Sequence, residues 1–168
     1  MHHTQVSCPC IGMIAVLFAV SVSVSCSHPP AEQNEPLPVI GAGVTQPLGS
    51  FNQVIQSSTA NLSVSANEKF DLPVRIENPG TDTWVSTGSA PVNVSYKWFL
   101  DGKMLPIEGE RTPLPKPISP KASQDVTVHV VAPSQAGKYE LRVTLVQEGV
   151  TWFMSKSNTY LALPVSVR

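Results

Sequence analysis

The sequence predicts an all-β protein preceded by a secretion signal and a linker. From Ala60 onward, apolar and polar residues alternate with a period of two, which is typical of half-buried β-strands. Turn residues interrupt the alternation at intervals close to those of an all-β sandwich. No stretch of ten residues shows a competing helical period of 3.6. The expected fold is therefore an antiparallel β-sandwich of about seven strands.

The amino terminus carries an apolar run of 14 residues, Ile11 to Val24. This is the length of the apolar part of a signal peptide and is shorter than the roughly 20 residues that span a bilayer as a helix. Residues 1–25 are therefore interpreted as a signal peptide. The stretch "SVSC", ending at Cys26, resembles the lipobox of bacterial lipoproteins. The resemblance implies that Cys26 is acylated and anchors the protein to a membrane.

Two other interpretations of this terminus stay open. Ser23 stands where lipoboxes usually have Leu, and the first ten residues contain no Lys or Arg. Ser23 and Ser25 also satisfy the rule of an ordinary signal peptidase, which would release a soluble protein. Alternatively, the run stays uncleaved and serves as a short anchor in a tilted or thinned bilayer.

Residues 26–59 are rich in Pro, Ser and Gln and show no sustained period, so they are interpreted as a linker. A coil of about 30 residues spans roughly 30 Å on average, which lifts a domain off lipid headgroups. Some apolar residues of this segment are able to dock locally on the domain, among them Phe51, Val54 and Ile55.

Residues 60–168 form the predicted sandwich domain. Six strands are expected from alternation around Leu62 to Val64, Phe70 to Ile76, Val92 to Leu100, Val126 to Val130, Tyr139 to Leu145 and Leu161 to Val167. A seventh is expected at Met104 to Ile107, after the Asp101-Gly102 turn. Pro73 and Pro164 lie inside strands and cannot donate to a ladder, so each position must be an edge or a bulge.

Two details favour an immunoglobulin-like version of the sandwich. Trp98 falls on the third strand, where such folds bury a tryptophan. The stretch "AGKYELRV" resembles a tyrosine corner, with Tyr139 opening the penultimate strand. All three cysteines, Cys8, Cys10 and Cys26, precede the domain, so its core must hold without a disulfide.

The segment "ENPGTDTW" and the later "RTPLPKPISPKASQDVTVHVVAPSQAGKYELRVTLVQEGVTWF" resemble a tryptophan-bearing Ig-like module of bacterial extracytoplasmic proteins. That module is similar in plan to the four-tryptophan domain of the Next-to-BRCA1 autophagy receptors. The resemblance covers about Ala60 to Arg168. It implies a β-sandwich used for protein contact, without enzymatic activity of its own. Only three tryptophans are present here, so the eukaryotic binding role does not carry over.

A candidate binding patch follows from the expected topology. The connection after the second strand and the connection before the last lie at the same pole of an immunoglobulin-like sandwich. Trp84 lies in the first connection, and Trp152 and Phe153 lie in the second. Arg111 is placed to offer a cation over an aromatic face. The four residues either form an exposed patch or close the end of the sandwich, and the second interpretation is preferred.

Composition narrows the function further. The net charge is −1 and the basic residues do not cluster, so nucleic acid is not an expected partner. We recognise no catalytic constellation, metal-ligand spacing or cofactor motif, and the chain is not expected to be an enzyme. The leading hypothesis is a non-enzymatic lipoprotein of the bacterial cell envelope, facing the periplasm or the outside. Its Ig-like domain would bind or brace a neighbouring protein.

Two alternative functions remain. The first is a carbohydrate-binding module that uses Trp84, Trp152 and Phe153 as stacking rings. The second is a single-span accessory subunit of a membrane complex, which would require the uncleaved anchor.

Overall fold

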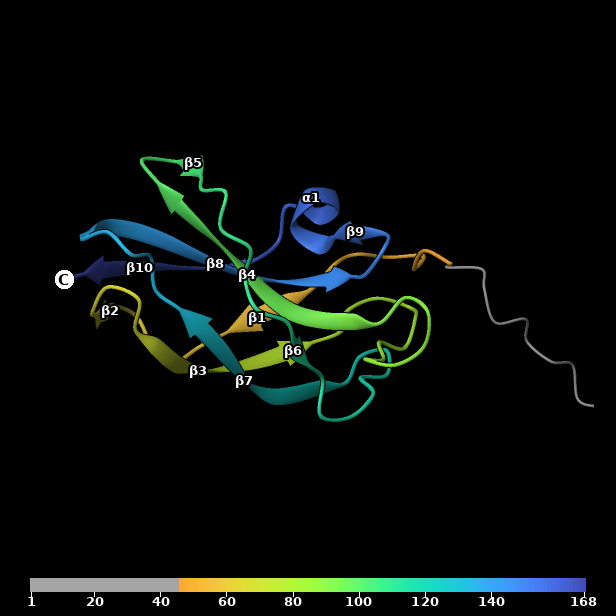
Figure 1. The fold of residues 1–168 in the computed structure, drawn as a ribbon. Helices are drawn as coiled ribbons and strands as arrows, with labels where there is room; N and C mark the ends of the chain where they lie inside the picture. The colour runs from red at the N-terminus through yellow and green to blue at the C-terminus, as the bar shows by residue number, and fades with distance from the viewer. Residues whose placement is uncertain (1–45) are drawn as a thin grey trace, which may run out of the picture. The chain divides into compact units, whose positions relative to one another are not determined.

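The computed structural model describes residues 46–168, which form two β-sheets packed face to face (Figure 1). The predicted signal peptide, Cys26 and most of the predicted linker lie outside these residues. Within the described range, no helix is long and apolar enough to cross a membrane. The chain is an all-β protein with an immunoglobulin-like sandwich.

The smaller sheet has three antiparallel strands in the order β1-β3-β7. They are β1 (Val54–Gln56), β3 (Lys69–Glu77) and β7 (Ser123–Val131). Alternate residues of β3 and β7 are buried, as their sequence pattern predicts. The other face of this sheet is exposed to solvent.

The larger sheet has seven strands, with the main order β2-β10-β8-β4-β5. These are β2 (Leu62–Val64), β10 (Leu161–Val167), β8 (Gly137–Gln147), β4 (Val92–Leu100) and β5 (Lys103–Met104). The short strands β6 (Thr112–Pro113) and β9 (Thr151–Trp152) pair with β4 and β8, and the helix α1 (Phe153–Ser157) follows β9. The β2–β10 pair is parallel and the other pairs are antiparallel.

The core between the sheets contains the two predicted immunoglobulin-like features. Trp98 is fully buried on β4, and its Nε1 donates to the carbonyl of Val131 at 3.0 Å. Tyr139 lies near the start of β8, and its hydroxyl donates to the carbonyl of Gln135 at 2.9 Å, which is the bond of a tyrosine corner. The two rings meet edge to face, with centroids 6.0 Å apart. The interpretation of both residues is confirmed.

The N-terminal boundary of the sandwich differs from the predicted one at Ala60. Strand β1 pairs with β3, and Ile55 is buried in the core. Upstream of β1, the buried Gln53 bonds to Thr144 Oγ1 at 2.7 Å and accepts from the Leu145 amide at 2.8 Å. Residues 53–56 therefore belong to the sandwich, although composition and the lack of a sustained period predict a linker as far as residue 59.

A seventh strand follows the Asp101-Gly102 turn as predicted, but it spans Lys103–Met104 instead of Met104 to Ile107. The turn at Asp101 and Gly102 forms with positive φ at both residues, 49° and 74°. Strand β5 then ends at Met104, because the chain leaves the edge and crosses the outer face of β4.

The two strand prolines have one common explanation. Strand β1 pairs with Arg75 to Glu77 and ends before it reaches Pro73. The carbonyl of Pro73 points to the side of β3 that β1 no longer covers, and it accepts from Ser57 Oγ at 2.9 Å. The N–H and C=O of one strand residue point to the same side, so the N–H that proline lacks would also lie on this unpaired side. On the other sheet, β2 pairs with β10 only from Val165 onward, just after Pro164. The chain passes from β1 in the smaller sheet to β2 in the larger one. Both prolines therefore lie at positions of β3 and β10 that this crossing leaves unpaired.

Candidate contact surface around Trp152

The four predicted patch residues separate into two groups. Trp84 is fully buried, with backbone bonds of 3.0 Å in both directions to Ile118. Phe153, the first residue of α1, is also fully buried. Their rings meet edge to face with centroids 5.4 Å apart, and Phe51 packs on the other side of Phe153 at 5.1 Å. This row of rings closes the end of the sandwich.

Trp152 lies on the opposite side of the sheet from Phe153, as strand alternation requires. The turn from β8 to β9 allows this placement, with Gly149 at a φ of 70° and a bond from the Val150 amide to the Gln147 carbonyl. Strand β9 then pairs Trp152 with Val146. The indole is only partly buried, and it covers the outer face of β4.

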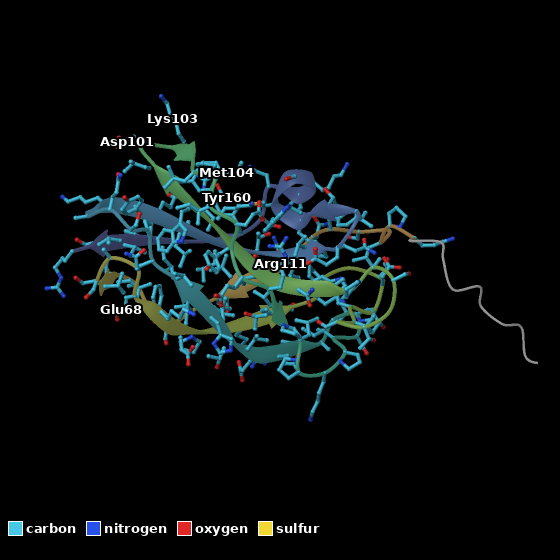
Figure 2. The ribbon with its side chains drawn as sticks, in the orientation of Figure 1. Glu68, Asp101, Lys103, Met104, Arg111 and Tyr160 are labelled. Carbon is cyan, nitrogen blue, oxygen red and sulfur yellow. The ribbon has the colours of Figure 1, made fainter. Side chains whose placement is uncertain are left out.

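Two cations lie against the Trp152 ring. Lys97 Nζ, from the outer face of β4, lies 4.3 Å from the ring centroid. Arg111, which Figure 2 labels, comes from the loop before β6. Its Cζ lies 4.8 Å from the same centroid. Such distances are those of cation–π contacts. The prediction that Arg111 joins an aromatic ring is confirmed for Trp152.

Two carboxylates neutralise these cations. Glu108 accepts from Lys97 Nζ at 2.6 Å and lies 3.4 Å from Arg111 Nη1. Glu148 accepts from Arg111 Nε at 2.8 Å and from Asn93 Nδ2 at 3.3 Å. The hydrogen bond from Lys97 lowers the pKa of Glu108. The charges of Lys97 and Arg111 and a bond from Arg111 act in the same direction, while desolvation opposes them.

The loop that carries these groups is fixed by Gly109. A Cβ at this position would lie far inside van der Waals distance of the Tyr96 carbonyl oxygen, and within 2.9 Å of Ser95 Oγ. Ser95 Oγ donates to the Gly109 carbonyl at 3.2 Å, and Arg111 Nη1 donates to the same oxygen at 2.8 Å. Only glycine permits this close approach, so Gly109 sets the position of both Glu108 and Arg111.

Sequence reasoning missed Lys97, Glu108 and Glu148. Alternation predicts that Lys97 points away from the core to solvent, but only 10% of its side chain is exposed. One signal was available: Lys97 is the only charged residue in the stretch "VNVSYKWFL". Glu108 directly follows the predicted seventh strand, and nothing local in the sequence indicates that it returns to β4.

The first described residues approach the domain next to the β8–β9 turn. Gln147 accepts from the Leu48 amide at 3.1 Å, and its Nε2 donates to the Gln46 carbonyl at 2.9 Å. Gly49 donates to Asp82 Oδ2 at 2.9 Å. The C-terminus lies at the opposite end of the sandwich (Figure 1). The end closed by Trp84 and Phe153 is therefore the end at which the chain enters.

In the described part of the chain, no three His, Cys, Asp or Glu side chains are grouped so that they could hold a metal ion. The charged groups around Trp152 are paired with one another, and Arg111, Glu148 and Trp152 line a shallow pocket beside the β8–β9 turn.

Neither a protein-family model nor a curated protein matches the chain. Among solved structures, the CARDB domain of a Pyrococcus furiosus protein, crystallised in complex with di-metal ions, shares 16% identity. The match covers 69% of this chain and 92% of that chain, with a TM-score of 0.40. A Niemann-Pick type C2 protein from the Japanese carpenter ant shares 13% identity over 70% of this chain and 89% of that chain, with a TM-score of 0.39.

A β-glucosidase from Listeria innocua, in complex with glucose, shares 10% identity. That match covers 69% of this chain but 16% of the β-glucosidase, with a TM-score of 0.38. At such low identities and TM-scores, none of these proteins indicates a ligand or an activity for this chain.

Proposed function

We propose that the protein is a non-enzymatic lipoprotein of the bacterial cell envelope, in which a lipid on Cys26 holds the domain at a membrane. In this proposal, the Ig-like domain faces the periplasm or the outside and binds or braces a neighbouring protein through Trp152 and Arg111. The observation that carries the proposal is the partly exposed Trp152 ring, held against Lys97 Nζ at 4.3 Å and the Arg111 guanidinium at 4.8 Å.

A ring held in this way suits protein contact. Tryptophan and arginine are the residues most enriched at the energetic centres of protein interfaces. The cation contacts and the two carboxylates already fix the orientation of both side chains, so little conformational entropy remains to be lost on binding.

The position of the surface relative to the tether also supports bracing at the membrane. Trp152 follows the turn whose first residue, Gln147, binds the entering segment at Gln46 and Leu48. About 19 residues separate Gln46 from Cys26, and a coil of this length spans roughly 24 Å on average. A neighbour anchored in the same membrane is within that reach.

The carbohydrate alternative is less well supported. It relied on three stacking rings, but Trp84 and Phe153 are fully buried and cannot reach a sugar. A single ring remains, and two cations lie against it. The accessory-subunit alternative differs only in the anchor, so the first experiment below separates it from the proposal.

The first experiment is the intact mass of the protein taken from its native membrane fraction. We expect a chain that begins at Cys26 and carries added fatty-acyl mass, and we expect Cys26→Ser to release the domain from the membrane. A membrane-held chain that begins at Met1 would contradict lipidation and support the uncleaved anchor. A soluble, unmodified chain would contradict any membrane tether.

The second experiment tests the contact surface by cross-linking in the native membrane, followed by quantitative binding to the captured protein. We expect Trp152→Ala to weaken that binding at least tenfold, because interface tryptophans carry large shares of binding energy. Val54→Ala, which shortens an exposed apolar residue on the other sheet, is the matched control. Equal binding by both variants, with unchanged unfolding midpoints, would refute the role of Trp152.

A further inference from the structure

The surface around Trp152 keeps hydrogen-bonding groups that no residue in the range 46–168 uses. Arg111 donates through Nε and Nη1, and no acceptor in this range takes its Nη2. Glu148 accepts through Oε1, and no donor there reaches its Oε2. The Trp152 indole N–H has no acceptor there either, and unlike the indole N–H of Trp84 it is not buried. Two donor groups and one acceptor group therefore remain for a partner.

These three side chains line one hollow beside the β8–β9 turn, together with Gly149 and Val150. The exposed fraction of the side chain is 34% for Arg111 and 32% for Glu148, so a partner can reach both. The hollow has a volume of about 250 Å³. Sites for whole small molecules usually measure roughly 300 to 1,000 Å³, so this one suits a single chemical group of a larger partner.

The charges of this surface cancel, which favours a neutral group in the hollow. Lys97 and Arg111 carry positive charges, and the carboxylates of Glu108 and Glu148 pair with them. A partner carboxylate in the hollow would lie beside Glu148, and a partner ammonium group would lie beside Arg111. Each would meet a like charge, while the opposite charge next to it is already paired. A neutral group avoids both repulsions.

A secondary amide matches the unpaired groups in number. Its carbonyl oxygen has two lone pairs, one for Arg111 Nη2 and one for the indole N–H of Trp152. Its single N–H is the donor that Glu148 Oε2 lacks. A primary amide, as in Asn and Gln side chains, would leave one of its two N–H donors unused. The main chain of a protein consists almost entirely of secondary amides.

We propose that the hollow beside the β8–β9 turn binds a main-chain peptide group in an exposed loop of the partner protein, where such groups are not already paired. The partner's carbonyl accepts from Arg111 and Trp152, and its N–H donates to Glu148. This inference rests on the proposed function, because it concerns the partner bound at Trp152. It adds the chemistry by which that partner is recognised, and it does not depend on how the chain is held at a membrane.

The first test follows the indole N–H signals of the isotope-labelled full chain in detergent micelles by NMR, with N-methylacetamide, a single secondary amide, as the probe. Acetamide, sodium acetate and glucose at equal concentrations stand for an Asn or Gln side chain, a carboxylate and a sugar. We expect N-methylacetamide to shift the Trp152 signal at least threefold more than the other three compounds do, and to leave the buried Trp84 and Trp98 unchanged. No shift, or an equal shift with another compound, would overturn the proposal.

The second test measures the dissociation constant of the full chain for the neighbouring protein captured by cross-linking. Trp152→Phe keeps an aromatic ring but removes the N–H, and Glu148→Gln keeps the shape but replaces one carboxylate oxygen with a donor. We expect each variant to weaken binding about threefold to tenfold, as the loss of one hydrogen bond does. Glu110→Gln, at an exposed carboxylate outside this hollow, is the control and should change binding less than about twofold. Test variants that weaken binding no more than the control would overturn the proposal.

Trp152→Ala keeps this inference separate from the proposed function. Weaker binding by Trp152→Ala, with unchanged binding by Trp152→Phe and Glu148→Gln, would overturn the peptide-group assignment and leave the contact surface standing. Unchanged binding by Trp152→Ala, together with an N-methylacetamide shift that Glu148→Gln abolishes, would refute the proposed contact and leave the amide site standing.

Discussion

Lys97 is a nearly buried cation on a strand whose other outward side chains, Asn93, Ser95 and Phe99, carry no charge. Burial of an ammonium group is costly unless a partner and hydrogen bonds compensate for it. Here the compensation comes from Glu108 at 2.6 Å and from the Trp152 ring at 4.3 Å. Both partners belong to segments outside β4, so Lys97 holds the Glu108 loop and the Trp152 ring against the outer face of this strand.

Gly109 should be the glycine most sensitive to substitution around this surface. Gly109→Ala would push its methyl group into the backbone of Tyr96, so we expect a loss of about 3 kcal/mol in the free energy of unfolding. Gly149→Ala is the matched control, because its Cβ meets open space and only the positive φ costs about 1 kcal/mol. Urea unfolding of both variants measures the difference, and a smaller loss for Gly109→Ala would show that the loop does not press on β4.

The ion pair of Glu108 should make stability depend on pH. Its pKa is lowered in the folded protein, so its stabilising contribution is complete above the ordinary carboxyl pKa of 4.5 and disappears as the pH falls through the lowered value. We expect the urea midpoint of Glu108→Gln to lie below that of the wild type at about pH 7 and to approach it at about pH 3. A constant difference between the two chains across this range would exclude the proposed ionic origin.

At the scale of elements, the alternation of residues predicted the long strands and their inward faces well. It failed for the segments that cover the outer face, because β9, α1 and the loop around Gly109 are too short to have a period. Alternation also labels Ser95 and Thr144 as solvent-facing, whereas both are fully buried beneath these segments. A local pattern records that a residue points away from the core. It does not record whether a distant segment returns to cover it.

The segment before β1 is held largely by Gln53, whose side chain forms hydrogen bonds with Thr144 and Leu145 of β8. Its Nε2 donates to Thr144 Oγ1 at 2.7 Å and to the Thr159 carbonyl at 2.5 Å, and its Oε1 accepts from the Leu145 amide at 2.8 Å. Removal of the amide leaves buried groups without partners, each costing about 1 to 3 kcal/mol.

We therefore expect Gln53→Ala to lower the free energy of unfolding by about 3 kcal/mol, as measured by urea denaturation. Asn52→Ala, at the exposed neighbouring position, should change it by less than about 0.5 kcal/mol. Similar values for the two variants would mean that the segment before β1 contributes little to the domain.

At the scale of the whole molecule, the candidate surface could be predicted only in part. The expected topology correctly brought Phe153 to Trp84 and Arg111 to an aromatic ring. It did not place Trp152 and Phe153 on opposite sides of the sheet, because that depends on where β9 resumes pairing after the turn at Gly149. The positions of Pro73 and Pro164 are explained only by the crossing of the chain from β1 in one sheet to β2 in the other, and no local sequence pattern indicates this crossing.

The entry of the chain beside Gln147 determines how the domain would bear tension. A pull between this entry and the C-terminus reaches β2 at its Leu62 end, by way of β1, and β10 at its Val167 end. These two strands are paired parallel, from Leu62 opposite Val165 to Val64 opposite Val167, so the pull runs along them and loads their hydrogen bonds in shear. Bonds loaded in shear share the force instead of opening one after another.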